Sequence, residues 1–472
     1  MPLPVLTVAQ MRQWENETWA SGQTEADVIR QVGHAVARSA QSLTRSADRI
    51  LILAGKGHNG DDARQARQFL AERSITILDV DDPAARLADL RRELARMPAL
   101  VVDGLFGIGL NRPLAREWVR FIEALNEADR PVLAVDVPSG LDAETGRAQG
   151  AAVRARVTLT VGAPKRGMLA STAWDYVGRL EAAHTVGLLP CSIPSDLQWT
   201  LPEDFRSFPP PREAAGHKGT YGHVGIIAGS SGFHGAAVLA ARGAQRAQPG
   251  LVTLHALENI YYPVAAQLQA VMVSPWSTFP NTEKYSAILA GPGLAGKDVP
   301  DETKGAVEKL WRESPNPMVV DASALAWIPV TAALPGIRVI TPHPGEAARL
   351  LGTMSDAVQS DRVGALRELS RKHGDCWVVL KGHQTLIGRS VGEVFVNSSG
   401  NPHLAQGGSG DLLSGYLAGF LAQPRLRSAA QTAIRYAAWS HGESADDLQA
   451  KYENWVVEDL IENLGSTSVS RC

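Results

Sequence analysis

The stretch His403-Leu-Ala-Gln-Gly-Gly-Ser-Gly-Asp-Leu-Leu-Ser-Gly415 sets three glycines directly before one carboxylate. Gly407, Gly408 and Gly410 lead into Asp411, and the apolar spacing of the residues that follow predicts a helix. A glycine-rich turn that opens a helix directs backbone N–H groups and the positive end of the helix dipole at one spot, where phosphate can bind. A neighbouring carboxylate can take the proton of an attacking hydroxyl group. The stretch predicts phosphoryl transfer to an alcohol, with an ordinary helix cap as the alternative.

The composition indicates a globular protein of more than one domain. The chain has 472 residues, more than one hydrophobic core usually holds. Its formal net charge is −3 and 44% of its residues are hydrophobic, so neither nucleic acid nor a membrane is expected as a partner. The amino terminus lacks the features of a signal peptide, and a cytoplasmic location is expected. Cys191, Cys376 and Cys472 form no C-x-x-C pair, which argues against disulfides and zinc.

A proline-rich segment, residues 188–216, divides the chain and predicts two domains, residues 1–200 and 201–472. In both domains, short β-branched runs alternate with longer helical runs, the pattern of parallel α/β sheets. A helix is predicted at residues 65–71. The predicted strands are 50–54, 75–80, 100–102, 132–135 and 157–161 in the first half, and 224–228, 251–256, 287–290, 318–320, 339–341 and 377–380 in the second.

Chemically active residues follow the predicted strands in both halves. Examples are Gly55-Lys-Gly-His-Asn-Gly-Asp-Asp62 and Asp136-Val-Pro-Ser139 in the first half, and Pro342-His-Pro-Gly-Glu346 and Lys381-Gly-His383 in the second. Ligands of open α/β sheets bind outside the carboxyl ends of the strands. The gathering of glycine, carboxylate, histidine and lysine at these ends therefore predicts two separate ligand sites.

In the second half, several features would complete a site around Asp411. Glycine-rich turns at residues 229–235 and 291–293 let a ligand approach the backbone. His343, between two prolines, suits a phosphate contact or a helix cap, and Lys381 suits nucleotide phosphate or plain solvation. Together they predict a nucleotide and an alcohol-bearing substrate in one crevice.

Five ordered motifs of this half resemble the ADP-dependent NAD(P)H-hydrate dehydratase family, whose fold is ribokinase-like α/β. They are His217-Lys-Gly-Thr-Tyr-Gly-His223, Gly291-Pro-Gly-Leu294, Thr341-Pro-His-Pro-Gly-Glu-Ala347, Lys381-Gly-His-Gln-Thr385 and Gln406-Gly-Gly-Ser-Gly-Asp411. The resemblance implies an adenine nucleotide in contact with Lys381, Gly382, His383, Gln384, Thr385 and Gly410. It implies a hydrated cofactor in contact with Ala236, Gly293, His343 and Asp411. The loop Asp321-Ala-Ser-Ala-Leu-Ala326 departs from the family's usual Asp-Ala-Asp-Ala-Leu-Asn.

The chemistry that this family implies is coherent. Hydrated NADH or NADPH carries a hydroxyl group at C6 of the nicotinamide ring, and hydroxide is a poor leaving group. Phosphorylation with ADP as donor, with Mg²⁺ expected, turns the hydroxyl into a good leaving group that the ring nitrogen can expel. We predict Asp411 as the base, and its place beside a helix N-terminus predicts that it stays ionised.

In the first half, Asn59, Asp103, Asp136 and Ser139 place oxygen atoms at three predicted strand ends. Oxygen ligands suit a hard cation such as K⁺ or Mg²⁺, although each of these residues is also a common turn former.

This half resembles the NAD(P)H-hydrate epimerase family over about residues 6–187, which implies a Rossmann-like three-layer α/β/α fold. The matching motifs are Gly55-Lys-Gly-His-Asn-Gly-Asp-Asp62, Val102-Asp-Gly-Leu-Phe-Gly-Ile-Gly109 and Val135-Asp-Val-Pro-Ser-Gly-Leu-Asp142. The resemblance implies K⁺ ligands at Asn59, Asp103 and Ser139, and a catalytic role for Asp136. It also implies substrate contacts at Asp136 and at His58, Asn59, Gly60, Asp61, Asp62, Gly107, Ile108, Gly109, Leu110, Asn111, Arg112 and Pro113. A homo-oligomer is expected, although the sequence does not settle the oligomeric state.

Two departures from the epimerase pattern matter. The family loop usually reads Gly-x-Gly-Asn-Asn-Gly-Gly-Asp-Gly, whereas this chain has His58 and Asp61 at the first Asn and the second Gly. Asp61 adds a second carboxylate beside Asp62, close to where the diphosphate should bind. The segment Val28-Ile-Arg-Gln-Val-Gly33 also differs from the usual Leu-Met-Glu-x-Ala-Gly.

Three hypotheses follow. The first is a two-domain enzyme that interconverts the R and S hydrates and dehydrates the S form. The second is a kinase of a small alcohol, which would release a phosphorylated product. The third treats the first half as a weakened or non-catalytic binding module.

Overall fold

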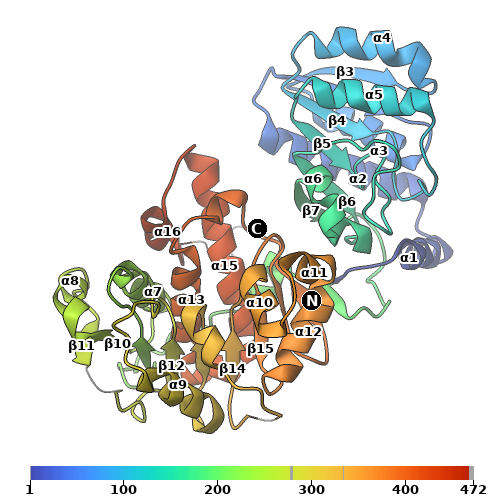
Figure 1. Cartoon of the computed structure of the whole chain (residues 1–472). Helices are drawn as coiled ribbons and strands as arrows, with labels where there is room; N and C mark the ends of the chain where they lie inside the picture. Colours follow the sequence, from blue (N-terminus) through green and yellow to red (C-terminus); the bar gives the residue numbers. More distant parts are fainter. Residues whose placement is uncertain (1, 277–279, 333, 467–472) are drawn as a thin grey trace. The chain divides into compact units, whose positions relative to one another are not determined.

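The computed structural model describes residues 2–276, 280–332 and 334–466, and Cys472 lies outside them. The chain folds into two units, one of Leu3–Asp196 and one that begins at Leu197 and includes Pro2 (Figure 1). The division between Asp196 and Leu197 falls inside the proline-rich segment 188–216.

The N-terminal unit is built on a parallel sheet with the strand order β3-β2-β4-β5-β6-β7. A two-residue strand, β1 (Leu3–Pro4), precedes the rest of the unit. The sheet strands are β2 (Arg49–Ala54), β3 (Ser74–Asp79), β4 (Leu100–Gly104), β5 (Val132–Val135), β6 (Val157–Val161) and β7 (Arg179–Ala183). The helices are α1 (Val8–Ala20), α2 (Glu25–Leu43), α3 (His58–Ala66), α4 (Pro83–Leu94), α5 (Arg116–Glu127) and α6 (Trp174–Val177).

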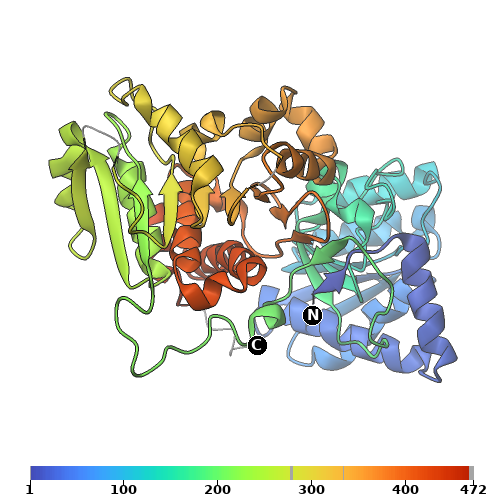
Figure 2. The same cartoon turned by 90° about the horizontal axis from the view of Figure 1, so that it is seen from below.

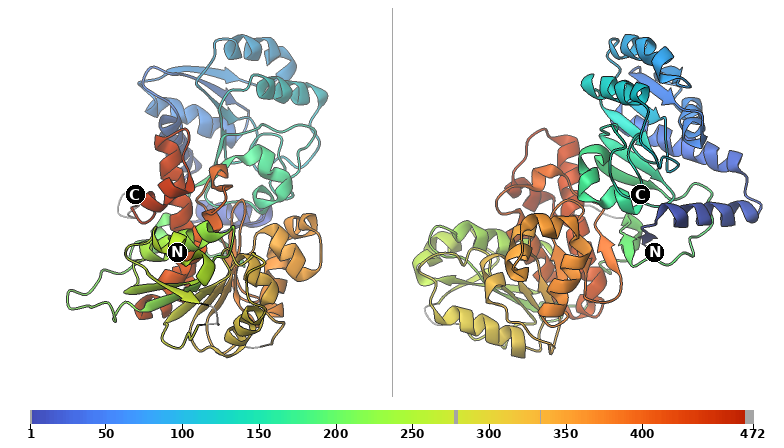
Figure 3. Two further views of the ribbon diagram at one scale, coloured as in Figure 1. Left: turned by 60° about the vertical axis from the view of Figure 1, so that its left-hand side comes forward. Right: turned by 45° about the vertical axis from the view of Figure 1, so that its right-hand side comes forward.

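Helices cover both faces of this sheet (Figure 3). Ile50 and Ile52 of β2 share a buried cluster with Val36 of α2, on one face. Leu51 points to the opposite face and shares a cluster with Phe121 of α5. Because side chains alternate along a strand, a central strand buried on both faces has apolar residues at every position. The expected three-layer α/β/α fold is confirmed.

The C-terminal unit is built on a larger, mixed sheet in which the strands run in the order β8-β17-β16-β15-β14-β13-β12-β9-β10-β11. The pairs from β15 to β11 are parallel, whereas β16 is antiparallel to both of its neighbours. The strands are β8 (Leu197–Trp199), β9 (His223–Ile227), β10 (Leu251–Leu257), β11 (Met272–Trp276), β12 (Ala287–Ala290), β13 (Met318–Val320), β14 (Arg338–Ile340), β15 (Trp377–Leu380), β16 (Leu386–Gly388) and β17 (Val394–Val396). The helices are α7 (His234–Arg246), α8 (Tyr261–Ala265), α9 (Glu302–Glu313), α10 (Pro344–Leu351), α11 (Ser355–Ser360), α12 (Arg362–Lys372), α13 (Ser409–Leu421), α14 (Pro424–Arg427), α15 (Ala430–Lys451) and α16 (Val457–Asn463).

Helix α13 is the centre of this unit and packs along the sheet beside α7 and α15 (Figure 2). It is buried almost all round, which explains its apolar sequence from Leu412 to Leu421. The backbones of α13 and α7 are in close contact at two glycines. A Cβ atom on Gly415 would lie 1.9 Å from the carbonyl oxygen of Ala240, and a Cβ atom on Gly243 would lie 2.2 Å from the carbonyl oxygen of Leu412. These glycines hold the N-terminus of α13 at a fixed position in the unit.

The fold class predicted from the sequence is confirmed, and five predicted strands match the structure to the residue: β5, β6, β12, β13 and β15. The helix predicted at residues 65–71 is wrong, because α3 begins at His58 and ends at Ala66. A tighter 3-10 turn, Arg67–Phe69, follows and brings Phe69 and Leu70 onto the α2 side of the core. Strands β7, β8, β11, β16 and β17 were not predicted.

Among the described helices, none has both the length and the apolar character needed to cross a membrane.

Candidate functional site

The glycine-rich turn of the C-terminal unit opens a helix as predicted. Helix α13 begins at Ser409, directly after Gly408, whose φ of 94° is left-handed and suits glycine. Among the described residues, no side chain caps this first turn. The start of α13 therefore presents backbone groups and the positive end of a buried helix dipole, with Asp411 in the same turn.

Lys381, at the end of β15, lies beside this turn. Its Nζ donates a hydrogen bond of 2.9 Å to Asp321 Oδ1, and a Cβ on Gly410 would lie 3.2 Å from the same Nζ. Burial opposes the charge of Lys381, but attraction to Asp321, Glu346 and Asp411 outweighs it and raises the pKa of the amine. The sequence did not single out Asp321 as the partner of Lys381, although its place after β13 could have indicated it.

The protonation of Asp411 differs from the prediction. Burial, together with the negative charges of Asp321 and Glu346, raises the pKa of Asp411 to about 7, although Lys381 opposes the shift. Desolvation and like charges therefore favour the protonated form of a carboxyl group that its place at a helix N-terminus predicts to be ionised. A carboxylate with a pKa of about 7 suits a general base that acts near neutral pH.

His343 is a helix cap. Its Nδ1 accepts hydrogen bonds from the N–H groups of Gly345 (3.0 Å) and Glu346 (3.3 Å) at the start of α10. Glu346 Oε2 in return accepts the His343 N–H at 2.8 Å. Half of the His343 side chain is exposed, and its Nε2 lies 3.6 Å from Glu346 Oε2.

Gly293 and Ala236 lie against each other. Gly293 has a left-handed φ of 66°, and a Cβ there would lie 2.9 Å from Ala236 Cβ and 2.5 Å from the Phe233 carbonyl oxygen. Only glycine fits this position without strain. The Ser230 hydroxyl group donates to the Gly293 carbonyl oxygen at 2.6 Å and fixes this turn.

Arg362, which sequence reasoning missed, holds the loop from Lys381 to Thr385 through hydrogen bonds to its backbone. The buried Arg362 guanidinium donates to the carbonyl oxygens of Leu380 (3.2 Å), His383 and Gln384 (3.3 Å). Thr385 Oγ1 donates to the Gly382 carbonyl oxygen at 3.1 Å. The side-chain amide of Gln384 is buried and makes no hydrogen bond to any described residue. A buried amide without a partner is a fitting contact for a ligand's polar atoms.

The described residues contain no group of three His, Cys, Asp or Glu side chains arranged to hold a metal ion. Asp321, Glu346 and Asp411 all act on Lys381, but they do not form a cage. A divalent ion at this site would therefore need ligands from the bound nucleotide.

In the N-terminal unit, Asp103 and Ser139 meet at the ends of β4 and β5. Asp103 accepts hydrogen bonds from the Ser139 hydroxyl group (2.6 Å) and backbone N–H (2.8 Å). Phe106 links them to Asn59, because its N–H donates to Ser139 Oγ at 2.8 Å and its carbonyl oxygen accepts from Asn59 Nδ2 at 2.9 Å. The structure thus brings Asn59, Asp103 and Ser139 around one short piece of backbone.

The carboxylate of Asp103 is fully buried, and burial raises its pKa to about 6 despite the hydrogen bonds from Ser139 and Leu105. No ion pair with a basic side chain is found for it among the described residues. A hard cation would supply the missing positive charge, and the oxygen atoms of Asp103, Ser139 and Asn59 suit such an ion.

Asp136 is paired with a buried lysine that sequence reasoning missed. Lys165 Nζ donates to Asp136 Oδ1, and also to Thr160 Oγ1 and the Val161 carbonyl oxygen, both at 2.9 Å. All three protons of the amine are used, and the side chain is 1% exposed. Asp136 itself has a left-handed φ of 65°, an uncommon conformation for a residue other than glycine. The signal available in the sequence was the position of Lys165 four residues after the predicted strand 157–161.

Two further carboxyl groups, those of Asp62 and Glu15, interact electrostatically with Asp136. Burial, together with the charges of Asp136, Asp61 and Glu15, raises the pKa of Asp62 on α3 to about 8. Burial and Asp136 likewise raise the pKa of Glu15 on α1, which sequence reasoning did not consider. A carboxyl group that stays protonated near neutral pH beside Asp136 can donate a proton.

Some of the remaining predicted substrate residues lie in α3 or beside Asp136, and the others are exposed or packed elsewhere. Gly60 is buried in α3, and Gly107 lies against Asp136 and Asn59, since a Cβ atom on Gly107 would lie 3.4 Å from Asp136 Oδ2 and 3.5 Å from the Asn59 side chain. His58 is exposed and lies 3.5 Å from Glu25. Ile108 packs on a small core cluster with Trp14. Gly109, Asn111, Arg112 and Pro113 are exposed and Leu110 is half-buried, in the loop before α5.

Comparisons with known proteins match both halves of the chain. The sequence model of the NAD(P)H-hydrate dehydratase family matches residues 224–466, and that of the YjeF-related protein N-terminus matches residues 80–167. A crystal structure of an ADP/ATP-dependent NAD(P)H-hydrate dehydratase from Bacillus subtilis, co-crystallized with ATP and Mg²⁺, is 29% identical. It matches with a TM-score of 0.50 over 56% of this chain and 95% of that chain.

Several relatives match this chain along nearly its whole length, across both halves. A bifunctional NAD(P)H-hydrate repair enzyme of Gloeobacter violaceus is 35% identical, over 94% of this chain and 93% of the relative. Those of Coxiella burnetii and Escherichia coli are 33% and 31% identical, over 90% and 94% of this chain and 91% and 89% of the relatives. Both resemblances stated from the sequence motifs are thereby confirmed. The chain belongs to the family of bifunctional NAD(P)H-hydrate repair enzymes.

Proposed function

We propose that the C-terminal unit dehydrates the S form of hydrated NADH or NADPH with ADP as the phosphoryl donor. The C6 hydroxyl oxygen attacks the β-phosphorus of ADP, AMP leaves, and Asp411 accepts the hydroxyl proton. The ring nitrogen lone pair then expels phosphate from C6, and loss of a proton from C5 restores the double bond of the reduced nicotinamide. The products are repaired cofactor, AMP and phosphate.

One observation carries this proposal: Asp411 lies in the uncapped first turn of α13, within the electrostatic reach of Lys381. Lys381 would bind the nucleotide phosphates, and Gln384 and Thr385 would contact the nucleotide from the loop that Arg362 supports. Ala236, Gly293 and His343 would contact the hydrated cofactor. Mg²⁺ is expected to accompany the nucleotide here, since the Bacillus subtilis relative was co-crystallized with ATP and Mg²⁺.

The deciding assay supplies S-hydrated NADH with ADP or ATP in separate reactions. We expect recovery of reduced-nicotinamide absorbance together with one free phosphate for each cofactor repaired. A stable phosphorylated alcohol as the end product would indicate a kinase instead, and no recovery with either nucleotide would refute the proposal.

The dehydration rate should depend on pH through Asp411. Because a base must be ionised and the pKa of Asp411 in the free protein is raised to about 7, kcat/KM for the S hydrate is expected to rise as the pH increases through about 7 and to level off above it. The measurement is kcat/KM against pH, from initial rates with S hydrate well below its KM. A rate that stays level well below this pH would contradict the assignment.

We further propose that the N-terminal unit interconverts the R and S hydrates at C6, with Asp136 as a catalytic group. Opening of the C6–N1 bond needs a base for the hydroxyl proton and an acid for N1, and closing from the other face inverts C6. Asp136 and the protonated Asp62 are suited to these two roles. Residues 107–113 and the first turn of α3 would contact the substrate.

Asn59, Asp103 and Ser139 would hold K⁺ beside this site, and the buried charge of Asp103 supports that choice. Replacing K⁺ in the buffer by tetramethylammonium is expected to slow R-to-S conversion strongly and to leave dehydration of the S form unchanged. Thermal melting of the protein in the two buffers gives an independent measure of binding, because a cation bound only to the folded state raises the melting temperature. Equal melting and equal conversion in both buffers would exclude this cation. A homo-oligomer and a cytoplasmic location remain predictions from the sequence.

A further inference from the structure

Asp61 creates a charge problem in the N-terminal unit. It lies in the first turn of α3, which the proposed function assigns to substrate contact and where the sequence predicts the diphosphate. The start of a helix favours anions, but an added carboxylate there repels a diphosphate and reduces that advantage. An unpaired Asp61 would therefore weaken substrate binding.

The structure contains a counter-charge one turn further along α3. Arg64 Nη1 lies 2.8 Å from Asp61 Oδ1, and its Nε lies 2.8 Å from Asp79 Oδ1 at the end of β3. Arg64 Nη2 donates to the carbonyl oxygen of Gly55 at 2.8 Å, in the turn that connects β2 to α3. Every nitrogen of the guanidinium is therefore engaged, and the planar fork of arginine is held in one orientation.

These contacts connect Arg64 to three separate segments around the first turn of α3. Asp61 belongs to α3, Asp79 to β3 and Gly55 to the turn after β2. The Arg64 side chain is only 31% exposed, so solvent screens its charge less than that of a free surface arginine. Its contact with the Gly55 carbonyl oxygen also fixes the backbone that precedes Asn59.

We propose that Arg64 is a positioning residue of the epimerase unit, which cancels the charge of Asp61 and so allows the substrate diphosphate to bind at the start of α3. The inference rests on the proposed epimerase function. It explains how this chain tolerates a carboxylate where the family motif usually has glycine. Asp61 and Arg64 then act as a pair, and removing both should be far less harmful than removing Arg64 alone.

The test is a double-mutant cycle with two readouts. Affinity for R-hydrated NADPH is measured by calorimetry, and KM and kcat are measured for R-to-S conversion. Arg64→Met is expected to weaken binding and raise KM about tenfold at low salt, with kcat within about twofold, because a bare Asp61 repels the diphosphate. The effect should shrink as the salt concentration rises, which a purely structural defect would not do.

The second arm removes the charge that Arg64 cancels. Asp61→Asn alone should tighten binding and lower KM by up to about threefold, because the charge of Arg64 is then no longer cancelled beside the diphosphate. The double variant Arg64→Met, Asp61→Asn should recover the wild-type values to within about twofold, a coupling that a cycle measures directly. Hydrate bound to the C-terminal unit is common to all four proteins and cancels in the comparison.

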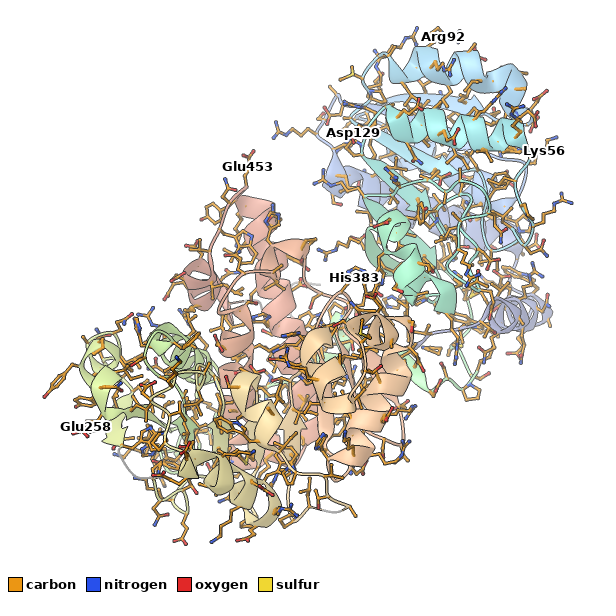
Figure 4. All side chains as sticks on the ribbon, viewed as in Figure 1. Lys56, Arg92, Asp129, Glu258, His383 and Glu453 are labelled. Atoms are coloured by element: carbon orange, nitrogen blue, oxygen red, sulfur yellow. The ribbon has the colours of Figure 1, made fainter. Side chains whose placement is uncertain are left out.

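A matched control is available on α4. Arg92 pairs with Asp89 at 2.8 Å with the same three-residue spacing as Arg64 and Asp61, but on a helix outside the proposed site (Figure 4). Arg92→Met should change neither readout.

Three outcomes would overturn the inference. The first is unchanged affinity in Arg64→Met, and the second is a loss of affinity that salt does not reduce. The third is a loss of affinity in the double variant equal to that of Arg64→Met, which would mean that Arg64 itself binds the diphosphate. If the wild type binds R hydrate but never converts it, the proposed epimerase function fails while the binding cycle still decides the role of Arg64. No binding of hydrate by the wild type would refute both.

Discussion

Replacing Asp411 by asparagine is expected to lower kcat for dehydration of the S hydrate by about 10²–10⁴-fold, the usual contribution of a general base. Asparagine preserves the shape of the side chain but cannot accept the hydroxyl proton. Nucleotide binding should persist, because Lys381 and the loop that Arg362 supports are untouched. The measurement is single-turnover recovery of reduced-nicotinamide absorbance with ADP in excess.

Two controls make this result specific. Asp356→Asn removes another aspartate from the first turn of a helix, α11, where it is exposed and outside the site, and should have no effect. R-to-S conversion by the same Asp411→Asn sample should equal that of the wild type, because it takes place in the other unit. Dehydration within about fivefold of the wild-type rate would rule out Asp411 as the base.

Replacing Lys165 by methionine is expected to abolish R-to-S conversion and to destabilise the N-terminal unit. The variant leaves Asp136 as a buried charge without its partner, and breaking a buried ion pair costs about 3–5 kcal/mol. Calorimetric unfolding should show the loss in the N-terminal unit. Dehydration of the S form, which depends on the C-terminal unit, should be unchanged.

A double variant separates catalysis from stability at this position. Lys165→Met combined with Asp136→Asn removes both charges, so most of the lost stability should return. Conversion of R to S should stay absent, because the catalytic carboxylate has gone. If Lys165→Met alone still converted R to S at the wild-type rate, Lys165 would not serve the reaction.

The strands and the family could be recognised from the sequence because both depend on local signals. A buried parallel strand is a short run of β-branched residues, and the runs at residues 132–135 and 157–161 have the bounds of β5 and β6. The start of α13 is also local, because Gly408 and its neighbours are in one turn. The helix predicted at residues 65–71 was wrong because the bend after Ala66 serves packing against α2, which no local pattern encodes.

The charged groups around each site were harder to predict. Lys165, Arg362 and Arg64 are ordinary basic residues in the sequence, and their roles arise from acceptors distant in the chain or across a turn. Lys165 is 29 residues from Asp136, and Lys381 is 60 residues from Asp321. Such pairs form only when the carboxyl ends of adjacent or nearby strands are brought to one edge of a sheet.

The sequence by itself determined the α/β class, the two-part organisation, the glycine turn before Asp411 and the family. Periodicity, turn chemistry and motif spacing are properties of residues close together in the sequence, so they can be recognised without knowing the fold. Only the tertiary structure decided the protonation of the sites. Burial and the carboxylates brought near Asp411 raise its pKa to about 7, against the expectation from its place at a helix N-terminus. Desolvation and long-range charge depend on what surrounds a group in space, and the order of residues along the chain does not specify that directly.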